Sequence, residues 1–333
     1  MKTPLLAAAL VIALASVTQA QDKPILHVYT YDSFVSDWGP GPAVEKAFED
    51  ICTCDLQFTG TGDGAALLAR IQLEGARSKA DVVLGLDTNL TARAVQTGLF
   101  APHNRSMNEN NLPIKWTDTH FLPYDWGYFA FVYDTTKLKT VPHNFELLAQ
   151  APDDFKIVIQ DPRSSTPGLG LLMWVKAAYG DRAPEIWAGL APHILTVTKG
   201  WSEAYGMFLD GEADMVLSYT TSPTYHLIAE DDDTKEAAIF DEGHYLQVEV
   251  AGRLAASDQA QLGDMFLDFM LSEAFQAIIP TTNWMYPAVL PNAGLPDGFE
   301  PPISPSKALL MSPEQALEIR NEALDEWLTA LSK

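Results

Sequence analysis

The segment ILHVYTY at residues 25–31 is the starting point for predicting the fold, because it begins a regular alternation of strands and helices. A short, mainly apolar run of this length is typical of a buried strand. The segments after it show helical spacing at 43–51, 65–74 and 90–97 and strand-like runs at 56–58 and 80–86. This β-α-β-α-β-α order predicts a parallel sheet covered by helices.

A second alternating block follows a polar, turn-rich region at 103–127. The apolar run at 128–134 predicts a long strand, and 245–250 is typical of a second strand that crosses back. The remaining pattern predicts strands at 155–160 and 214–219, helices at 168–179 and 202–209, and a mainly helical tail at 258–333. Two α/β blocks joined by two long strands predict two lobes with a ligand cleft between them.

The N-terminal segment indicates export. Lys2 precedes an apolar run, and Thr18 and Ala20 occupy the −3 and −1 positions of a cleavage site. The run is short for a bilayer span, so a signal peptide is favoured over a membrane anchor. The expected organisation is a signal peptide at 1–20, lobe 1 at 21–127, lobe 2 at 128–245, and a return to lobe 1 with C-terminal helices at 246–333.

The composition excludes some partners. The chain has 333 residues, and its 44 Asp and Glu against 21 Lys and Arg give a formal net charge of −23. Such acidity argues against nucleic acid, because the phosphate backbone selects basic surfaces. It is compatible with a cationic ligand, although net charge alone identifies none.

Signatures of enzymes and metal sites are weak. The sequence contains no G-x-S-x-G, H-E-x-x-H or P-loop motif, and its seven histidines have no metal-ligand spacing. Cys52 and Cys54 are the two cysteines, so a four-cysteine zinc site is impossible. They could form a strained disulfide or remain two buried thiols, and the lack of a nearby histidine disfavours a catalytic thiol. We therefore expect neither catalysis, nor a cofactor, nor a metal.

Four segments lie where the cleft of an open α/β sheet forms, at the carboxyl ends of strands. They are residues 30–34, 60–64, 161–168 and 218–225. In the third, the hydroxyls of Ser165 and Thr166 and several backbone N–H groups come together at a predicted helix N-terminus. This arrangement suits an anion or a polar ligand arm, and the alternative is an ordinary capped helix.

Aromatic residues provide a second indication of a ligand. Five of them lie beside turns, outside the regular core stripes: Tyr31, Trp201, Tyr219, Tyr225 and Trp284. Together with an acidic residue such as Asp63 they could hold a flat cation by stacking and cation–π attraction. The alternative is that these side chains pack in the core with their polar ends satisfied.

Several of these stretches resemble the thiamine-binding periplasmic proteins of bacterial thiamine ABC transporters. The resemblance is carried by VYTYDSF at 28–34, TKGWSEAYG at 198–206, LSYTTSP at 217–223 and NWMYP at 283–287, and also by 37–42, 79–87, 160–163 and 165–170. These stretches span nearly the whole mature chain in one order, and the Cys-x-Cys pair fits the same family pattern.

The resemblance implies a type II periplasmic-binding-protein fold, α/β and two-lobed, with a mostly parallel sheet flanked by helices in each lobe. Carried over position by position, the ligand contacts of the family fall on Asp63, Gly64, Ser165, Thr166, Trp201, Tyr219, Thr220, Thr221 and Ser222. Tyr31, Tyr225 and Trp284 match its aromatic wall.

The function that the resemblance implies is periplasmic capture of thiamine, and of its mono- and diphosphate, by a monomer that delivers them to an ABC permease. Three alternatives stay open. One is a thiamine-degrading transferase similar to thiaminase I, which uses a cysteine nucleophile. The second is a ferric-ion binder that uses paired tyrosines such as Tyr219 and Tyr225, and the third is a polyamine binder.

Overall fold

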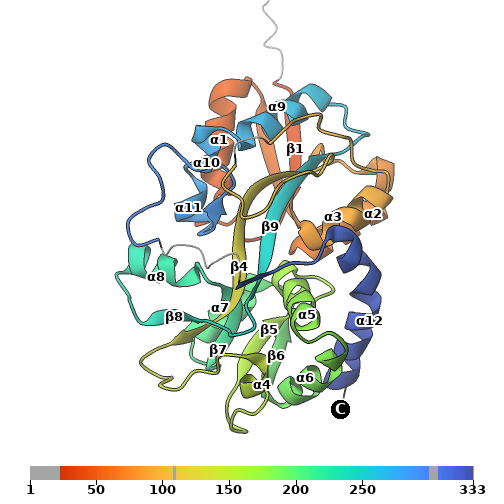
Figure 1. The fold of residues 1–333 in the computed structure, drawn as a ribbon. Helices are drawn as coiled ribbons and strands as arrows, with labels where there is room; N and C mark the ends of the chain where they lie inside the picture. The colour runs from red at the N-terminus through yellow and green to blue at the C-terminus, as the bar shows by residue number, and fades with distance from the viewer. Residues whose placement is uncertain (1–22, 108–109, 300–306, 333) are drawn as a thin grey trace, which may run out of the picture.

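The computed structural model describes residues 23–107, 110–299 and 307–332, so the predicted signal peptide lies outside the described residues. The chain folds into two lobes, each with helices around strands of a shared sheet (Figure 1). We call the part around the first three strands the first lobe and the part around the fifth to seventh strands the second lobe. The residue limits of the lobes remain a prediction.

The first lobe begins as the sequence pattern predicts. Its elements are β1 (Ile25–Thr30), α1 (Gly41–Cys52), β2 (Asp55–Gly60), α2 (Gly64–Glu74), β3 (Val82–Asp87) and α3 (Thr88–Gln96). β1 pairs in parallel with both β2 and β3, which places the carboxyl ends of all three strands at one edge.

The second lobe repeats this scheme with more helices. Its elements are α4 (Phe145–Leu148), β5 (Ile157–Gln160), α5 (Thr166–Tyr179), α6 (Ala183–Leu190), β6 (Ile194–Thr198), α7 (Trp201–Leu209), β7 (Met215–Tyr219), α8 (Ser222–Glu230) and β8 (Lys235–Ala238). β5 pairs in parallel with β6 and β7. The turns that precede α5, α7 and α8 therefore lie at the edge that faces the first lobe.

Two long strands connect the lobes, β4 (Leu122–Asp134) and β9 (His244–Arg253). They are antiparallel, and the strand order across the sheet is β2-β1-β3-β9-β4-β7-β5-β6. The expectation that 103–127 is turn-rich throughout is wrong at its end, because β4 already begins at Leu122. Pro123 and Asp125 interrupt the apolar run, yet both are buried in the strand.

The C-terminal part contains α9 (Ala260–Met270), α10 (Glu273–Gln276), α11 (Ile279–Thr282), β10 (Tyr286–Pro287), β11 (Ala308–Leu309) and α12 (Pro313–Leu331). α9 packs on α1 and β9 in the first lobe, whereas α12 lies against α3 of the first lobe and against α5 and α6 of the second. In Figure 1 this last helix runs along one side of both lobes.

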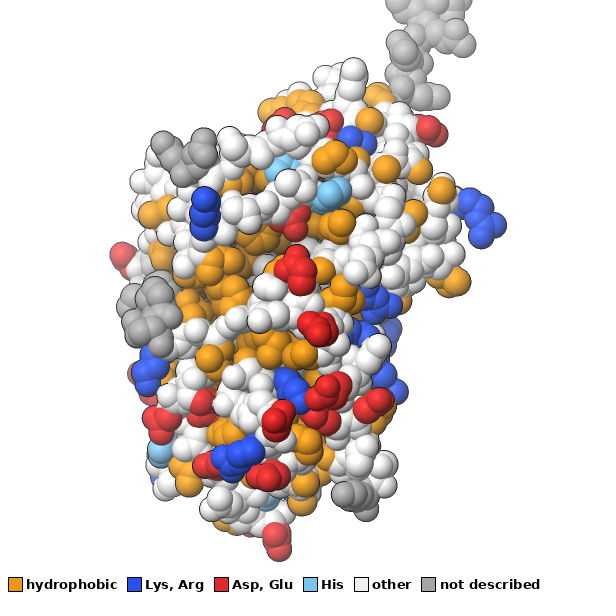
Figure 2. Space-filling view, turned by 45° about the vertical axis from the view of Figure 1, so that its right-hand side comes forward, with side chains coloured by type: hydrophobic (Ala, Val, Ile, Leu, Met, Phe, Trp, Pro, Cys, Tyr) orange, Lys and Arg blue, Asp and Glu red, His pale blue; other side chains and the backbone are white. Residues whose placement is uncertain are grey.

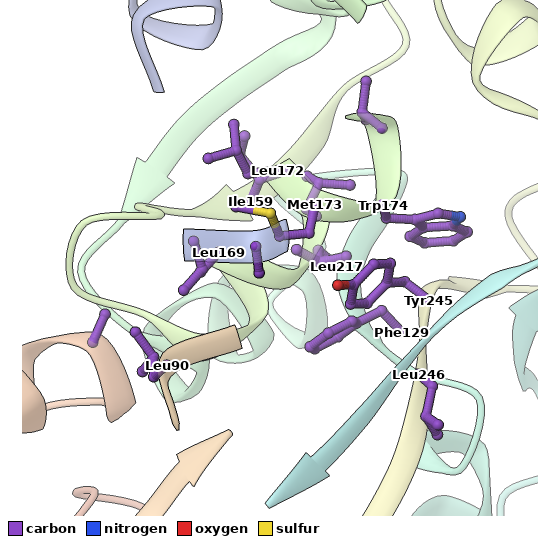
Figure 3. Close-up of a cluster of buried hydrophobic side chains, with 14 of the residues drawn as sticks. Leu90, Phe129, Ile159, Leu169, Leu172, Met173, Trp174, Leu217, Tyr245 and Leu246 are labelled. Atoms are coloured by element: carbon purple, nitrogen blue, oxygen red, sulfur yellow. The ribbon is translucent and has the colours of Figure 1, made fainter. Parts of the chain in front are cut away.

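The core of the second lobe forms around α5, whose residues from Thr166 to Val175 are all buried. Figure 3 shows Leu169, Leu172, Met173 and Trp174 of this helix beside Ile159, Leu217 and Phe129 from the strands. Burying such side chains stabilises the lobe by roughly 1.5–3 kcal/mol each. This packing fixes the position of the α5 N-terminus at the lobe boundary.

A capping box at the start of α12 gives a test of local stability. Ser312 Oγ accepts from the Gln315 backbone N–H at 3.2 Å, and the Gln315 side chain accepts from the Ser312 N–H at 3.0 Å. Ser312→Ala should lower the free energy of unfolding by about 1 kcal/mol. Thermal unfolding should show a lower midpoint for this variant and an unchanged one for Ser332→Ala at the other end of the helix. Equal midpoints would contradict the cap.

The sequence leaves open whether the two cysteines form a disulfide or remain thiols, and the structure shows which. Cys52 and Cys54 form a disulfide at the end of α1. Within the described ranges no helix is long and apolar enough to cross a membrane.

Candidate ligand-binding site

A cavity of about 400 Å³ lies between the two lobes. Its wall combines the loop after β1, the N-terminus of α2 and residues 281–285 with the N-terminal ends of α5, α7 and α8. Neither cysteine lines it. A larger hollow of about 900 Å³ runs along α3 and the start of α12, but none of the predicted site residues lines that one.

Seven of the twelve predicted residues line the cavity: Tyr31, Asp63, Trp201, Tyr219, Ser222, Tyr225 and Trp284. The other five do not line it: Gly64, Ser165, Thr166, Thr220 and Thr221. Four of these five adjoin wall residues in the chain, and Ser165 lies two positions before Pro167. All are buried except Thr220, which is half-buried. The aromatic residues and Asp63 therefore come together as expected, while the hydroxyl-bearing group lies behind the wall.

The aromatic wall is built from pairs of aromatic rings in contact. Trp201 stacks on Tyr205 with ring centroids 4.9 Å apart, and Trp38 approaches Trp201 at 6.2 Å. On the other side, Tyr225 and Trp284 meet edge to face at 5.3 Å. Trp284 has a φ of 56°, a left-handed conformation that is uncommon for a bulky residue. Such strain is typical of residues that a binding site holds in place.

A hydrogen-bond network behind the wall fixes two of these rings. The Tyr205 hydroxyl lies 2.9 Å from Nε2 of the buried His226, whose Nδ1 lies 2.7 Å from Glu230. Tyr225 donates to the same carboxylate at 2.8 Å. His226, Glu230 and Asp232 are close enough to share a metal ion. However, each of them already has hydrogen-bond partners in the protein.

The lobes contact each other at Asp63, the N-cap of α2. Its carboxylate accepts from the Gly64 N–H at 2.8 Å and from the Ser165 hydroxyl of the second lobe, also at 2.8 Å. Nearby, the Ala66 N–H donates to the Ser164 carbonyl at 2.9 Å. Burial raises the pKa of Asp63, whereas the hydrogen bonds from Ser165 and Gly64 to its carboxylate lower it. The N-termini of α2 and α5 thus face one another, so their dipoles favour negative charge here.

Three further carboxyl groups are buried near the cavity. Glu249 of β9 lines it, and Asp125 of β4 is its cross-strand neighbour. Burial raises the pKa of Glu249 to about 7, and burial together with the charge of Glu249 raises that of Asp125. Asp87, at the end of β3, also has a pKa raised to about 7 by burial. Among the described residues, no Lys or Arg pairs with these acids or with Asp63.

The surface contrasts with this interior. On the face shown in Figure 2, acidic side chains lie among lysines and arginines. Typical surface pairs are Lys46 with Asp50 and Arg182 with Glu146. The cavity thus holds acids without counter-ions, whereas surface acids such as Asp50 and Glu146 pair with basic residues. A positively charged ligand would compensate the negative charge of an ionised carboxyl group in the cavity.

The sequence interpretation missed several wall residues, above all Glu249, Tyr205, Trp38 and Asn283. Glu249 follows Gln247 at alternate positions of a predicted strand, and such an alternation is typical of a solvent-facing side. Both side chains are buried instead. Trp38 and Asn283 lie inside stretches that carry the family resemblance, and this was the available signal for them.

The chain is similar to curated relatives over nearly its whole length. It is 53% identical over 311 residues to the thiamine-binding periplasmic protein of Escherichia coli (strain K12), a match that covers 93% of this chain and 94% of the relative. It is 48% identical over 323 residues to the protein of the same name from Brucella abortus, with 97% and 96% covered. These relatives are named as binding proteins.

Solved structures agree with the fold. A structure named periplasmic thiamin binding protein matches with a TM-score of 0.90 at 53% identity, and the match covers 93% of this chain and 97% of that one. Iron-bound HitA from Pseudomonas aeruginosa matches with a TM-score of 0.76 at 21% identity, which concerns the fold alone. The family model described as bacterial extracellular solute-binding protein matches residues 77–314. The chain therefore belongs to the bacterial extracellular solute-binding proteins.

Proposed function

We propose that this chain binds thiamine in the periplasm and delivers it to the membrane permease of an ABC importer. The observation that carries the proposal is a cavity that combines aromatic faces with buried carboxyl groups that no cationic side chain neutralises. The names of the relatives at 48% and 53% identity support thiamine as the ligand.

The chemistry of thiamine matches this wall. Its aminopyrimidine and thiazolium rings are flat, and the thiazolium carries a permanent positive charge. Trp201 and Tyr219 provide ring faces for stacking and cation–π attraction, each worth about 0.5–2 kcal/mol. Glu249 and Asp63 bring negative charge to the same cavity. A volume of about 400 Å³ lies in the usual range for small-ligand pockets.

The polar arm of the ligand would lie toward the helix N-termini. Pro167, Trp201 and Ser222 line the cavity, and they stand at the starts of α5, α7 and α8. The backbone N–H groups of Trp201 and Ser222 suit a hydroxyl or a phosphate. The Thr220 Oγ1 is buried without a hydrogen-bond partner in the described part of the chain, as a donor or acceptor awaiting a ligand would be. We therefore retain Gly64, Ser165, Thr166, Thr220 and Thr221 as proposed contacts, and the phosphates as proposed ligands.

The alternative functions fit less well. The two cysteines form a disulfide away from the cavity, so neither provides the free thiol that a thiaminase-like reaction needs. Burial raises the pKa of Tyr219, and its hydroxyl donates to Gln247 at 3.0 Å. This environment disfavours the tyrosinate that would bind ferric ion. A polyamine would place ammonium groups on the ring faces, but it has no flat ring to stack against them.

Thiamine titration tests the proposal directly. Trp38, Trp201 and Trp284 line the cavity, so binding should change tryptophan fluorescence in a saturable way. The same titration with thiamine mono- and diphosphate ranks the three ligands. Spermidine and ferric citrate, applied at the same concentrations, represent the other binding functions. A response to either of these, together with none to thiamine, would overturn the proposal.

A further inference from the structure

Glu249 and Asp125 form a pair of carboxyl groups beneath the proposed thiamine site. They face each other across the antiparallel strands β9 and β4. Asn283 Nδ2 lies 2.6 Å from Asp125 Oδ2 and 3.5 Å from Glu249 Oε2. Glu249 lines the cavity, whereas Asp125 is fully buried behind it.

The hydrogen-bond donors around the pair are distributed unequally. Glu249 accepts from the Tyr124 hydroxyl at 2.7 Å, from the Tyr31 hydroxyl at 3.0 Å and from the Gln247 amide at 2.9 Å. Asp125 accepts from Asn283, while its Oδ1 has no partner among the described residues. Three donors stabilise the ionised form of Glu249, so the proton of the pair belongs on Asp125.

We propose that Asp125 and Glu249 share one proton in the empty site and that a cationic ligand displaces this proton. The inference rests on the proposed function, because it concerns the positive charge of thiamine. On binding, the Asp125 O–H bond breaks and the proton passes to the solvent. Two carboxylates then remain, stabilised by one thiazolium cation. The pair therefore selects a charged ring over a neutral ring of the same shape.

Other titratable groups also face the Asp125–Glu249 pair. They are the hydroxyls of Tyr31, Tyr124 and Tyr219 and the carboxyl groups of Asp63 and Asp87. Burial raises the pKa of the three tyrosines, which stay protonated at neutral pH. Asp87 is the competing proton source, because its own pKa is about 7. It accepts from Asn89 at 2.6 Å, and its Oδ1 has no partner in the described structure.

The pH dependence of binding has a defined sign. The pKa of Glu249 is raised to about 7, and that of Asp125 is raised by burial and by Glu249. Near pH 7 the pair holds the Asp125 proton, which must leave before both carboxylates can meet the cation. Affinity for thiamine should therefore fall by up to about tenfold for each pH unit as the pH approaches 7 from above, which is the limit for one coupled proton. Below pH 7 Glu249 also becomes protonated, so the fall should be steeper there.

Calorimetry in buffers of different ionisation enthalpy counts the protons released at pH 7. The wild type should release a substantial fraction of one proton per thiamine bound. Asp125→Asn, which keeps a donor for Glu249, should abolish the release, and Asp87→Asn should preserve it. Glu249→Gln should weaken thiamine binding at least about tenfold, because the charge facing the ring is lost. Release that persists in Asp125→Asn and disappears in Asp87→Asn would overturn the proposal.

Two further measurements separate this inference from thiamine binding itself. A neutral isostere, with a thiophene in place of the thiazolium, should bind at least about tenfold more weakly than thiamine and release no proton. Equal affinity for both compounds would leave thiamine binding intact and overturn the charge selection. In the ligand-free protein at pH 7, infrared spectra should show a protonated carboxyl C=O band that is lost in Asp125→Asn. A spectrum of the wild type without such a band would overturn the shared proton, whatever the protein binds.

Discussion

Replacing Trp201 with alanine should weaken thiamine binding about 30- to 700-fold, since truncating a central aromatic anchor costs about 2–4 kcal/mol. Trp201 begins α7, lines the cavity and stacks on Tyr205. The indole ring thus has one supported face and can offer the other to the ligand. Removing it takes away the stacking surface and leaves water in its place.

The fold should tolerate this change. The Trp201 indole donates to Ser218 Oγ at 2.8 Å, and that hydroxyl keeps a second partner in Ser222 at 2.7 Å. The side chain is also only partly buried, so its loss creates no closed cavity in the core. Far-ultraviolet circular dichroism and thermal unfolding should therefore resemble those of the wild type.

Calorimetric titration with thiamine measures the affinity loss. Trp116→Ala is the matched control, because it removes the same atoms from a residue that does not line the cavity and whose indole donates to the Phe121 carbonyl. Its affinity should stay within about twofold of the wild type. A Trp201→Ala protein that is folded and binds within twofold of the wild type would remove Trp201 from the proposed site.

The elements that the sequence predicted well are apolar runs with clear ends. β1 and β3 are short buried strands followed by turns or helix starts, so local pattern and tertiary burial agree. α6 and β6 were not predicted, because α6 has only eight residues and β6 is half-exposed with a mixed pattern. The first half of β4 was also missed, since a proline and an acid inside a strand contradict local propensity.

Some residues of the candidate site could likewise be predicted from the sequence, and others could not. Tyr31 directly follows β1, and Asp63 lies in the turn between β2 and α2. The topology of parallel sheets places ligands at such strand ends, so position alone indicated these two residues. Glu249 is buried against two tyrosines that lie far from it in the chain, Tyr31 and Tyr124. Sequence spacing carries no information on such partners. The net charge of −23 was equally uninformative, because the acids that matter are defined by their burial between the lobes.

Gly64→Ala should weaken thiamine binding through a steric clash at the contact between the lobes. A Cβ at Gly64 would lie 2.2 Å from Thr166 Oγ1 of the second lobe and 2.7 Å from the Gly85 carbonyl of the first. Gly64 is helical with negative φ, so alanine itself is compatible with its backbone. The cost is therefore steric, and it arises where Asp63 and Ser165 hold the lobes together.

Forcing a methyl group into such a contact costs about 1–3 kcal/mol, which corresponds to about 5- to 150-fold in affinity if closure bears the cost. Small-angle scattering with saturating thiamine should show a larger radius of gyration than for the wild type. The double variant with Thr166→Ala removes the atom that clashes across the boundary and should recover part of the affinity, whereas the clash with Gly85 remains. A lower unfolding midpoint without any loss of affinity would place the strain inside the first lobe and contradict a role for Gly64 in closure.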